Sequence, residues 1–456
     1  MKEEKPVRNL SVDEGRRGGL ARHGLSFFRQ SGWMMVSAIV GGGFMWAVHP
    51  ILQKPVDQVE LGAVTEFLKR FVQESISKDQ YGLFCTFLNL LGLIGIPAIG
   101  LQTIFAQQAA SAISEPLERQ LRTTIRTVLA VIFLIWLVLL LGSLFVQDAV
   151  IRVLGIGDAA ALWIMLVAGL FVLWMPVLLG LLQGRQNFLW FGWASILSGL
   201  GRCLAIAVTV RVLGNRSTGT MLGVLFGAGV NFVICLFQAF PLLRGPGAPV
   251  PWRRWLGRVA PLTFGLGAMA FMVNADVVVV RSLLPKDQSG LYGAARIIGN
   301  ALIFFTIPLA TVMFPKVVQS AARAERTDVV ALALGTTALL GGAAALVCTL
   351  FPGLPLWLMY DRSYFVIKPL VPWLAWCILP LTLSNVLTNN LLARERYRAV
   401  PWMVLVALGY GATLLGLSHR ILQADALGGF KMVAWILGAY SLFLLGVSAW
   451  FTWRKA

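Results

Sequence analysis

Three charged residues lie inside long apolar stretches of this 456-residue sequence: Arg202, Asp276 and Arg296. A charge in the hydrocarbon core of a membrane costs about 2.5–3.5 kcal/mol on insertion scales, so such residues usually face a cavity and mark function. Asp276 precedes a predicted turn between two apolar stretches by about as many residues as separate that turn from Arg296. At about 1.5 Å of rise per residue, both side chains lie at one depth, roughly 10 Å from the membrane surface. The spacing therefore allows an ion pair.

Two interpretations of this pair remain open. In the first, Asp276 and Arg296 pair permanently and only hold a helical hairpin together. In the second, Arg296 binds an anionic substrate while Asp276 exchanges a proton or Na⁺. Asn274 neighbours Asp276 in sequence but points elsewhere on the same helix, and we group it with Asp276 as a candidate ion-coupling residue.

A polar stripe extends the candidate site. Tyr292, Arg296 and Asn300 are spaced i, i+4, i+8 and share one helix face, which suits a water-filled cavity better than lipid. Arg202 stands alone in its apolar stretch and either reaches a central cavity or extends outward to the membrane surface. The candidate substrate-binding residues are therefore Arg296, Arg202, Asn300 and Tyr292.

The composition excludes most other classes of protein. Hydrophobic residues make up 58% of the chain and charged residues only 13%, whereas soluble domains have about 45–50% and about 25%. Disorder, a soluble enzyme and a nucleic-acid-binding domain are therefore ruled out. The sequence contains no GxSxG, HExxH, paired-cysteine or P-loop motif, and its three histidines are scattered. We expect a membrane protein that is not an enzyme and has neither a cofactor nor a bound metal.

Twelve apolar windows are long enough to cross a bilayer, since a crossing needs about 20 residues. All are expected to be helices, because a helix satisfies its own backbone hydrogen bonds in lipid. The predicted spans are 31–51, 81–104, 127–147, 161–183, 188–210, 219–241, 259–281, 290–313, 329–351, 366–391, 399–418 and 428–452. Most of the 38 Lys and Arg residues fall on the N-terminal side of the membrane, which predicts that both termini are cytoplasmic.

An internal repeat defines the domain organisation. The segment KDQYGLF at 78–84 recurs as KDQSGLY at 286–292, and RQNF at 185–188 is matched by RERY at 394–397, about 210 residues later in each case. Pro97 and Pro308 are also in matching positions and should kink their spans. Each half has six spans, so both halves enter the membrane in the same direction. The predicted domains are an N-terminal tail (1–30), an N-lobe (31–243), a linker rich in Pro, Gly and Arg (244–258), and a C-lobe (259–456).

Together, the KDQ-x-GL-[FY] repeats, LLQGRQNF after the fourth span and Asn274-x-Asp276 followed by the 290–296 stretch form a pattern. It resembles the polysaccharide-transporter (Wzx-type) flippases of the multidrug/oligosaccharidyl-lipid/polysaccharide (MOP) exporter superfamily, over roughly residues 30–450. The resemblance implies an all-α integral membrane protein with two parallel six-helix lobes that open alternately around a cationic cavity. This sequence departs from the more polar members of the family, because its first predicted span has no internal charge.

The resemblance also implies a function and a location. Such flippases carry a polyprenyl-pyrophosphate-linked oligosaccharide across the bacterial inner membrane for O-antigen (lipopolysaccharide), capsule or exopolysaccharide synthesis, and Arg296 and Arg202 would contact the pyrophosphate. We expect the lipid-linked oligosaccharide, the bilayer, a coupling H⁺ or Na⁺ and polysaccharide-assembly proteins as partners, and no nucleic acid. The alternatives are a cation-coupled drug or metabolite antiporter of the same superfamily, a membrane-embedded sugar-lipid enzyme and a non-transporting scaffold.

Overall fold

The structure is a computed structural model that describes residues 33–34, 36–53, 76–212, 217–301 and 329–454. Every regular element within these ranges is a helix, and eleven helices there are long and apolar enough to cross a membrane. They correspond to eleven of the twelve predicted spans. The predicted span 290–313 falls on a helix described over 286–301 and continues outside the described residues, and the predicted tail 1–30 also lies outside them.

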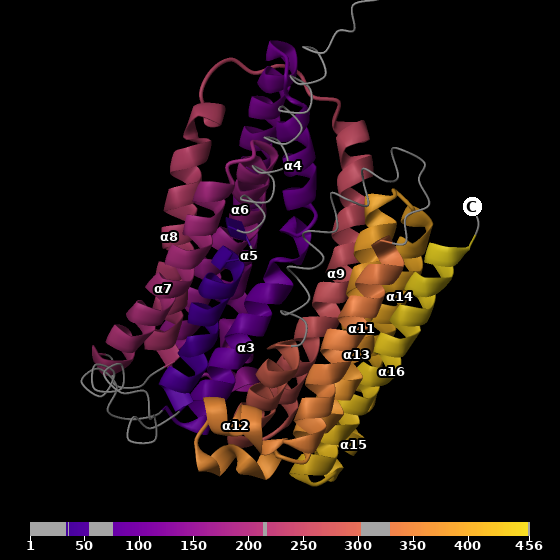
Figure 1. Cartoon of the computed structure of the whole chain (residues 1–456). Helices are drawn as coiled ribbons and strands as arrows, with labels where there is room; N and C mark the ends of the chain where they lie inside the picture. The colour runs from indigo at the N-terminus through magenta and orange to yellow at the C-terminus, as the bar shows by residue number, and fades with distance from the viewer. Residues whose placement is uncertain (1–32, 35, 54–75, 213–216, 302–328, 455–456) are drawn as a thin grey trace, which may run out of the picture.

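The N-lobe contains the helices up to the linker. Their bounds are Val36–Gln53, α3 (Lys78–Ile94), η2 (Ile96–Ala98), α4 (Leu101–Ser111), α5 (Glu115–Leu154), α6 (Ala159–Gly184), α7 (Phe188–Val212) and α8 (Ser217–Leu243). Figure 1 shows α3 to α8 gathered on one side of the molecule.

The C-lobe contains the remaining helices, which lie beside the N-lobe in Figure 1. Their bounds are α9 (Trp252–Leu283), the helix 286–301, α11 (Val329–Leu350), α12 (Gly353–Met359), η3 (Arg362–Ile367), α13 (Leu370–Ala393), η4 (Tyr397–Ala399), α14 (Val400–Gly416), α15 (Ser418–Gln423) and α16 (Ala426–Trp453). The linker crosses from α8 to α9 over one end of the molecule, here named the linker end, and α12 lies at the opposite end. The fold is that of about twelve membrane helices in two parallel lobes.

The internal repeat is visible in the backbone. Gln186 follows α6 and Glu395 follows α13, and these equivalent residues have φ angles of 57° and 55°. They are the non-glycine residues with positive φ in the described part of the chain. Both turns are closed in the same way, by a bond from the residue's own N–H to the carbonyl three residues earlier. A side chain in the left-handed region is unfavourable, so its recurrence at matched places reflects one shared turn.

Prolines set two helix boundaries. The second predicted span is broken into α3, η2 and α4, because Pro97 lacks the N–H that would continue the ladder. The matching Pro308 lies outside the described residues. Helix α9 begins at Trp252, inside the predicted linker, with Pro251 as its N-cap residue. Proline is tolerated at a helix start, where its missing donor is not needed, so the nonhelical linker is shorter than predicted.

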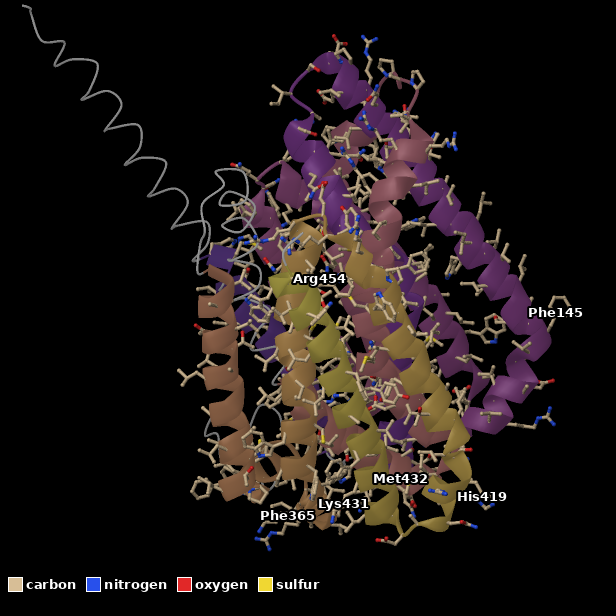
Figure 2. All side chains as sticks on the ribbon, turned by 90° about the vertical axis from the view of Figure 1, so that its right-hand side faces the viewer. Phe145, Phe365, His419, Lys431, Met432 and Arg454 are labelled. Carbon is tan, nitrogen blue, oxygen red and sulfur yellow. The ribbon has the colours of Figure 1, made fainter. Side chains whose placement is uncertain are left out.

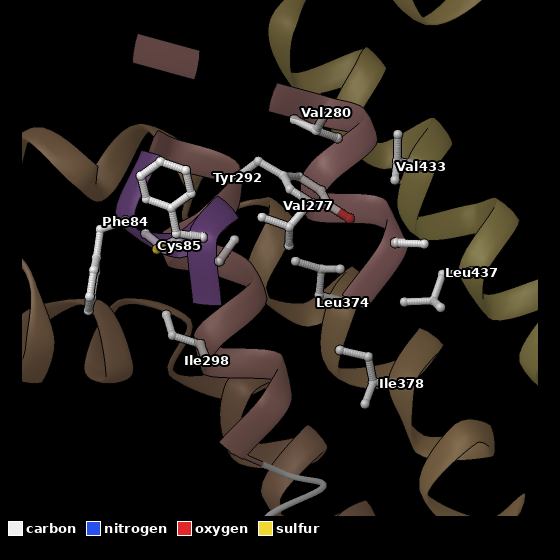
Figure 3. Close-up of a cluster of buried hydrophobic side chains, with 14 of the residues drawn as sticks. Phe84, Cys85, Val277, Val280, Tyr292, Ile298, Leu374, Ile378, Val433 and Leu437 are labelled. Carbon is white, nitrogen blue, oxygen red and sulfur yellow. The ribbon is translucent and has the colours of Figure 1, made fainter. Parts of the chain in front are cut away.

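The outer faces of the helices are apolar and exposed, as lipid contact requires. Phe145 on α5 is 90% exposed and projects outward in Figure 2. Inside, one hydrophobic cluster spans both lobes toward the α12 end, and a second joins α4, α5 and α6 to the start of α9. Figure 3 shows Phe84 and Cys85 of the N-lobe packed near Tyr292 and Val277 of the C-lobe. The two lobes therefore share a core at the end opposite the linker.

Candidate functional site

The two copies of the repeat pack against each other between the lobes. A Cβ atom placed on Gly290 would lie 2.0 Å from the carbonyl oxygen of Lys78, and one on Gly82 would lie 2.6 Å from the amide nitrogen of Gly290. Next along the helices, Gly293 faces Cys85. Only glycine permits this approach of two backbones. We name this contact the seam, formed by Lys78, Gly82 and Cys85 against Gly290 and Gly293.

A fully buried arginine closes the end of the seam. The guanidinium of Arg281 on α9 lies 2.7 Å from Asp79 Oδ1, and its Nη1 donates to Ser289 Oγ at 2.8 Å. Its Nε donates to the carbonyl of Leu154 at 2.8 Å, where α5 ends. Arg281 thus joins the first repeat, the second repeat and the α5 terminus. Charge-assisted bonds of this kind are among the strongest hydrogen bonds in proteins, so Arg281 latches the two lobes together.

Tyrosines near α12 add a second connection between the lobes. The hydroxyl groups of Tyr360 and Tyr81 form a hydrogen bond of 2.8 Å. The Tyr81 hydroxyl also lies 2.9 Å from His49 Nδ1. Tyr364 donates to the side-chain oxygen of Gln53. Burial raises the pKa of Tyr360 and of Tyr364, so both hydroxyls stay protonated at physiological pH. The C-lobe residues around α12 therefore close over the ends of two N-lobe helices.

The predicted ion pair lies within the C-lobe and is completely buried. Arg296 Nε donates to Asp276 Oδ2 at 2.7 Å, and both side chains are 0% exposed. The hydroxyl of Tyr292 donates to the same oxygen at 2.7 Å, and the N–H of Val277 donates to Oδ1 at 3.0 Å. The carboxylate is thus fully hydrogen-bonded, which is the condition for burying a charge at acceptable cost.

The remaining donors of Arg296 are also occupied. Nη1 donates to Asn300 Oδ1 at 2.6 Å, and Nη2 donates to the carbonyl of Val273 at 2.9 Å. The structure therefore brings four of the six predicted residues, Asp276, Tyr292, Arg296 and Asn300, into one network. In this conformation the guanidinium of Arg296 is committed to groups of its own lobe.

The other two predicted residues lie apart from this network. Asn274 donates to the carbonyl of Ala270 at 2.6 Å on its own helix, and its amide faces Gly92 of α3 across the lobe boundary. Arg202 lies in the N-lobe with its guanidinium 5.9 Å from the ring centre of Phe84. Its Nε is buried without a hydrogen-bond partner among the described residues. Arg202 is thus packed against an interior aromatic residue of α3.

Several residues of the interface were not singled out from the sequence. Arg281 ends the predicted span 259–281 and is not among the candidate residues, yet it is 2% exposed. The KDQ repeat marks equivalent places in the two lobes, which a pseudo-twofold axis relates, but it does not specify that these places touch. No sequence signal connects His49 with Tyr360, which are more than 300 residues apart. Their proximity depends on how the lobes pack.

Comparison with solved structures identifies the fold. An inward-facing MATE-family multidrug resistance transporter of the MOP superfamily superposes with a TM-score of 0.67 at 12% identity, covering 91% of this chain and 98% of that one. The lipid II flippase MurJ in an inward closed conformation gives 0.64 at 13% identity, with 92% and 87% covered. A MOP transporter from Pyrococcus furiosus, whose binding pocket is described as reversed in polarity, gives 0.59 at 15%, with 94% of each chain covered.

Comparison by sequence gives a family but no curated relative. No curated protein matches the chain. The model of the family described as "Polysaccharide biosynthesis protein" matches residues 71–321, which include α3 to α9, the linker and both copies of the KDQ repeat. This match covers more than half of the sequence, so the chain belongs to the polysaccharide biosynthesis protein family, and its fold is that of the MOP superfamily transporters.

Proposed function

We propose that this membrane transporter is a flippase that moves a polyprenyl-pyrophosphate-linked oligosaccharide across the bacterial inner membrane, for O-antigen, capsule or exopolysaccharide synthesis. The observation that carries the proposal is the combination of its family with the seam. A polysaccharide biosynthesis protein with a transporter fold has its two lobes closed on each other at one end by Gly82 and Gly290. Alternating access requires such a contact to form and break.

The charge distribution supports an anionic cargo. Because the seam and the Arg281 latch close the lobes at the α12 end, alternating access would require the lobes to separate there and to approach each other at the linker end. Arg202 has a guanidinium nitrogen without a partner among the described residues, and it packs on Phe84 beside the seam. Arginine binds phosphate oxygens in a two-pronged geometry. Arg202 would therefore contact the pyrophosphate, and Arg296 would do so if the phosphate oxygens displace Asp276 from its guanidinium.

The direct test is transport by the purified protein. Proteoliposomes containing the chain should move a fluorescent polyprenyl-pyrophosphate oligosaccharide between leaflets, as measured by its accessibility to a membrane-impermeant quencher. A polyprenol-linked sugar without phosphate should not move. Equal movement of both lipids, or movement of neither by folded protein, would contradict the proposal. Genetic complementation of a strain that lacks its own flippase provides the corresponding test in cells.

A cation-coupled antiporter is the second candidate, because one observation favours it. Asp276 is a buried carboxylate within a fold shared with MATE transporters, and a buried acid is a suitable exchange site for H⁺ or Na⁺. In proteoliposomes, an imposed proton or sodium gradient should then drive uptake of a soluble cationic substrate. The flippase proposal instead expects a gradient, if needed, to accelerate movement of the sugar lipid. If the chain is a flippase, polysaccharide-assembly proteins would be its partners in the cell.

A further inference from the structure

A pocket of about 300 Å³ opens between the lobes at the linker end, within the size range of small-ligand sites. It is lined by the end of α4, the first turns of α5 and the beginning of α9. Its polar lining includes Gln107, Gln108, Gln120, Arg254, Trp255 and Arg258, and none of the described residues that line it is acidic. The pocket therefore offers hydrogen-bond donors and positive charge, without a negative group to repel an anion.

Two residues that line this pocket carry buried polar atoms without partners among the described residues. Trp255 is only 9% exposed, and its indole Nε1 has no hydrogen-bond partner among the described residues. The side-chain oxygen of Gln108 is also buried and unpartnered there, but it is an acceptor and does not favour an anion. An indole N–H can only donate, and leaving it unsatisfied costs about 1–3 kcal/mol. The rings of Trp252 and Phe105 hold Trp255 in place at centroid distances of 5.6 and 6.2 Å.

The two arginines that line the pocket lie at a helix N-terminus, where positive charge is unfavourable. Arg254 and Arg258 lie in the first two turns of α9, whose first turn contains no acidic residue and whose N-cap makes no side-chain hydrogen bond. The N-terminus of a helix carries a partial positive charge, which disfavours cations and attracts anions. Neither arginine forms an ion pair with a described acid. A bound anion would offset the mutual repulsion of these charges and satisfy the Trp255 donor.

We infer that this pocket binds the phosphate or diphosphate head group of a lipid at the linker end. Arg254 and Arg258 would hold the phosphate oxygens, and the indole N–H of Trp255 would donate to one of them. Two lipids share this chemistry: the polyprenyl-pyrophosphate cargo and an ordinary anionic phospholipid. The first assignment rests on the proposed function, and the phosphate site itself does not. If the cargo is the ligand, the pocket is where its head group first docks at the linker end.

The test measures lipid binding to the full-length protein in detergent by native mass spectrometry. The probes are polyprenyl pyrophosphate, polyprenol, phosphatidylglycerol and phosphatidylcholine. The variants are R254Q/R258Q, which removes both charges, and W255F, which removes only the N–H while keeping the aromatic packing. R253Q is the matched control, because Arg253 is exposed on the same turn but does not line the pocket. Thermal melting of each variant verifies that it is folded.

The expected result is binding of a phosphate lipid that weakens about tenfold or more in R254Q/R258Q, weakens in W255F, and is unchanged in R253Q. Preference for polyprenyl pyrophosphate over phosphatidylglycerol would identify the cargo as the ligand, and equal binding of both would identify bilayer phospholipid. Wild-type binding by folded R254Q/R258Q would overturn the site. Transport of the sugar lipid by wild-type protein is measured separately, so loss of the site and loss of the flippase function give different results.

Discussion

At the scale of single residues, the molecule buries two arginines in different ways. Arg296 is paired with Asp276 inside one lobe, whereas Arg281 joins Asp79 of the other lobe. The first pair could be predicted from the sequence, because residues on both sides of a short turn return to the same depth. The second could not, because Arg281 and Asp79 are brought together only when the lobes pack. Arg296 stabilises one lobe because its partner lies in the same lobe, whereas Arg281 joins the two lobes because its partner lies in the other.

The Asp276–Arg296 pair gives a prediction that separates stability from transport. Either R296A or D276A leaves an uncompensated buried charge and should destabilise the protein by about 3–5 kcal/mol. The double variant D276A/R296A removes both charges and should recover most of the melting temperature in detergent. We expect it to remain inactive in the proteoliposome assay, because the proposed substrate contact at Arg296 and the proposed exchange site at Asp276 are both missing. A double variant that transports normally would show that the pair only holds the hairpin together.

Arg202 gives a second prediction at this scale. R202A removes a guanidinium whose Nε has no described partner, so the melting temperature should change little, while flipping of the sugar lipid should fall about tenfold or more. R202K should restore only part of the rate, because an ammonium group lacks the planar, two-pronged geometry. Transport rates at matched protein levels provide the measurement. Unchanged transport by R202A would mean that this arginine only packs against Phe84.

At the scale of helices, the repeat is both a signature of the fold and part of its interface. The break at Pro97 could be predicted, and the turns after α6 and α13 fall on the matched RQNF and RERY segments, because both features depend on local backbone chemistry. The start of α9 was placed too late because Pro251, within a segment rich in Pro and Gly, begins a helix instead of extending the linker. The sequence did not reveal the contact between Gly82 and Gly290, because a glycine pattern alone does not specify its partner.

The seam predicts a specific effect of one methyl group. G290A would place a Cβ against the Lys78 carbonyl oxygen and should force the repeat helices apart. We expect the variant to insert but to lose most transport. G42A is the matched control, because Gly42 lies in a membrane helix with no atom within 4 Å of its added Cβ. Loss of transport in both variants would point to a general effect of changing helical glycines.

The Arg281 latch predicts how easily the seam opens. Cys85 is 1% exposed beside Gly293, so its thiol reports opening when the other four cysteines are replaced by alanine. Removal of the charged bonds in R281Q should increase the labelling rate of Cys85 by a water-soluble maleimide about tenfold or more. D79N should produce a smaller increase, and the exposed control R152Q should produce none. Equal labelling of R281Q and the parent protein would mean that Arg281 does not hold the lobes together.

At the scale of the whole molecule, the two ends differ in structure and in charge. The end opposite the linker is closed by the seam, the Arg281 latch and the tyrosines around α12. The linker end contains a pocket and is strongly basic. Its described arginines are Arg119, Arg122, Arg126, Arg185, Arg244, Arg253, Arg254, Arg258, Arg394, Arg396, Arg398 and Arg454. The described part of the molecule is therefore closed at one end and strongly basic at the other.

This polarity gives a prediction about orientation. Short basic loops remain in the cytoplasm, so the linker end should be cytoplasmic and the seam should face the opposite side. A reporter fused at Pro249 should be active only in its cytoplasmic form, and one fused at Asp425, beyond α15, only in its exported form. Cysteine labelling from outside intact cells gives an independent measurement at the same positions. Reversed signals would mean that the linker end faces away from the cytoplasm, and they would put the Arg254–Arg258 pocket on the wrong leaflet to receive a newly made sugar lipid.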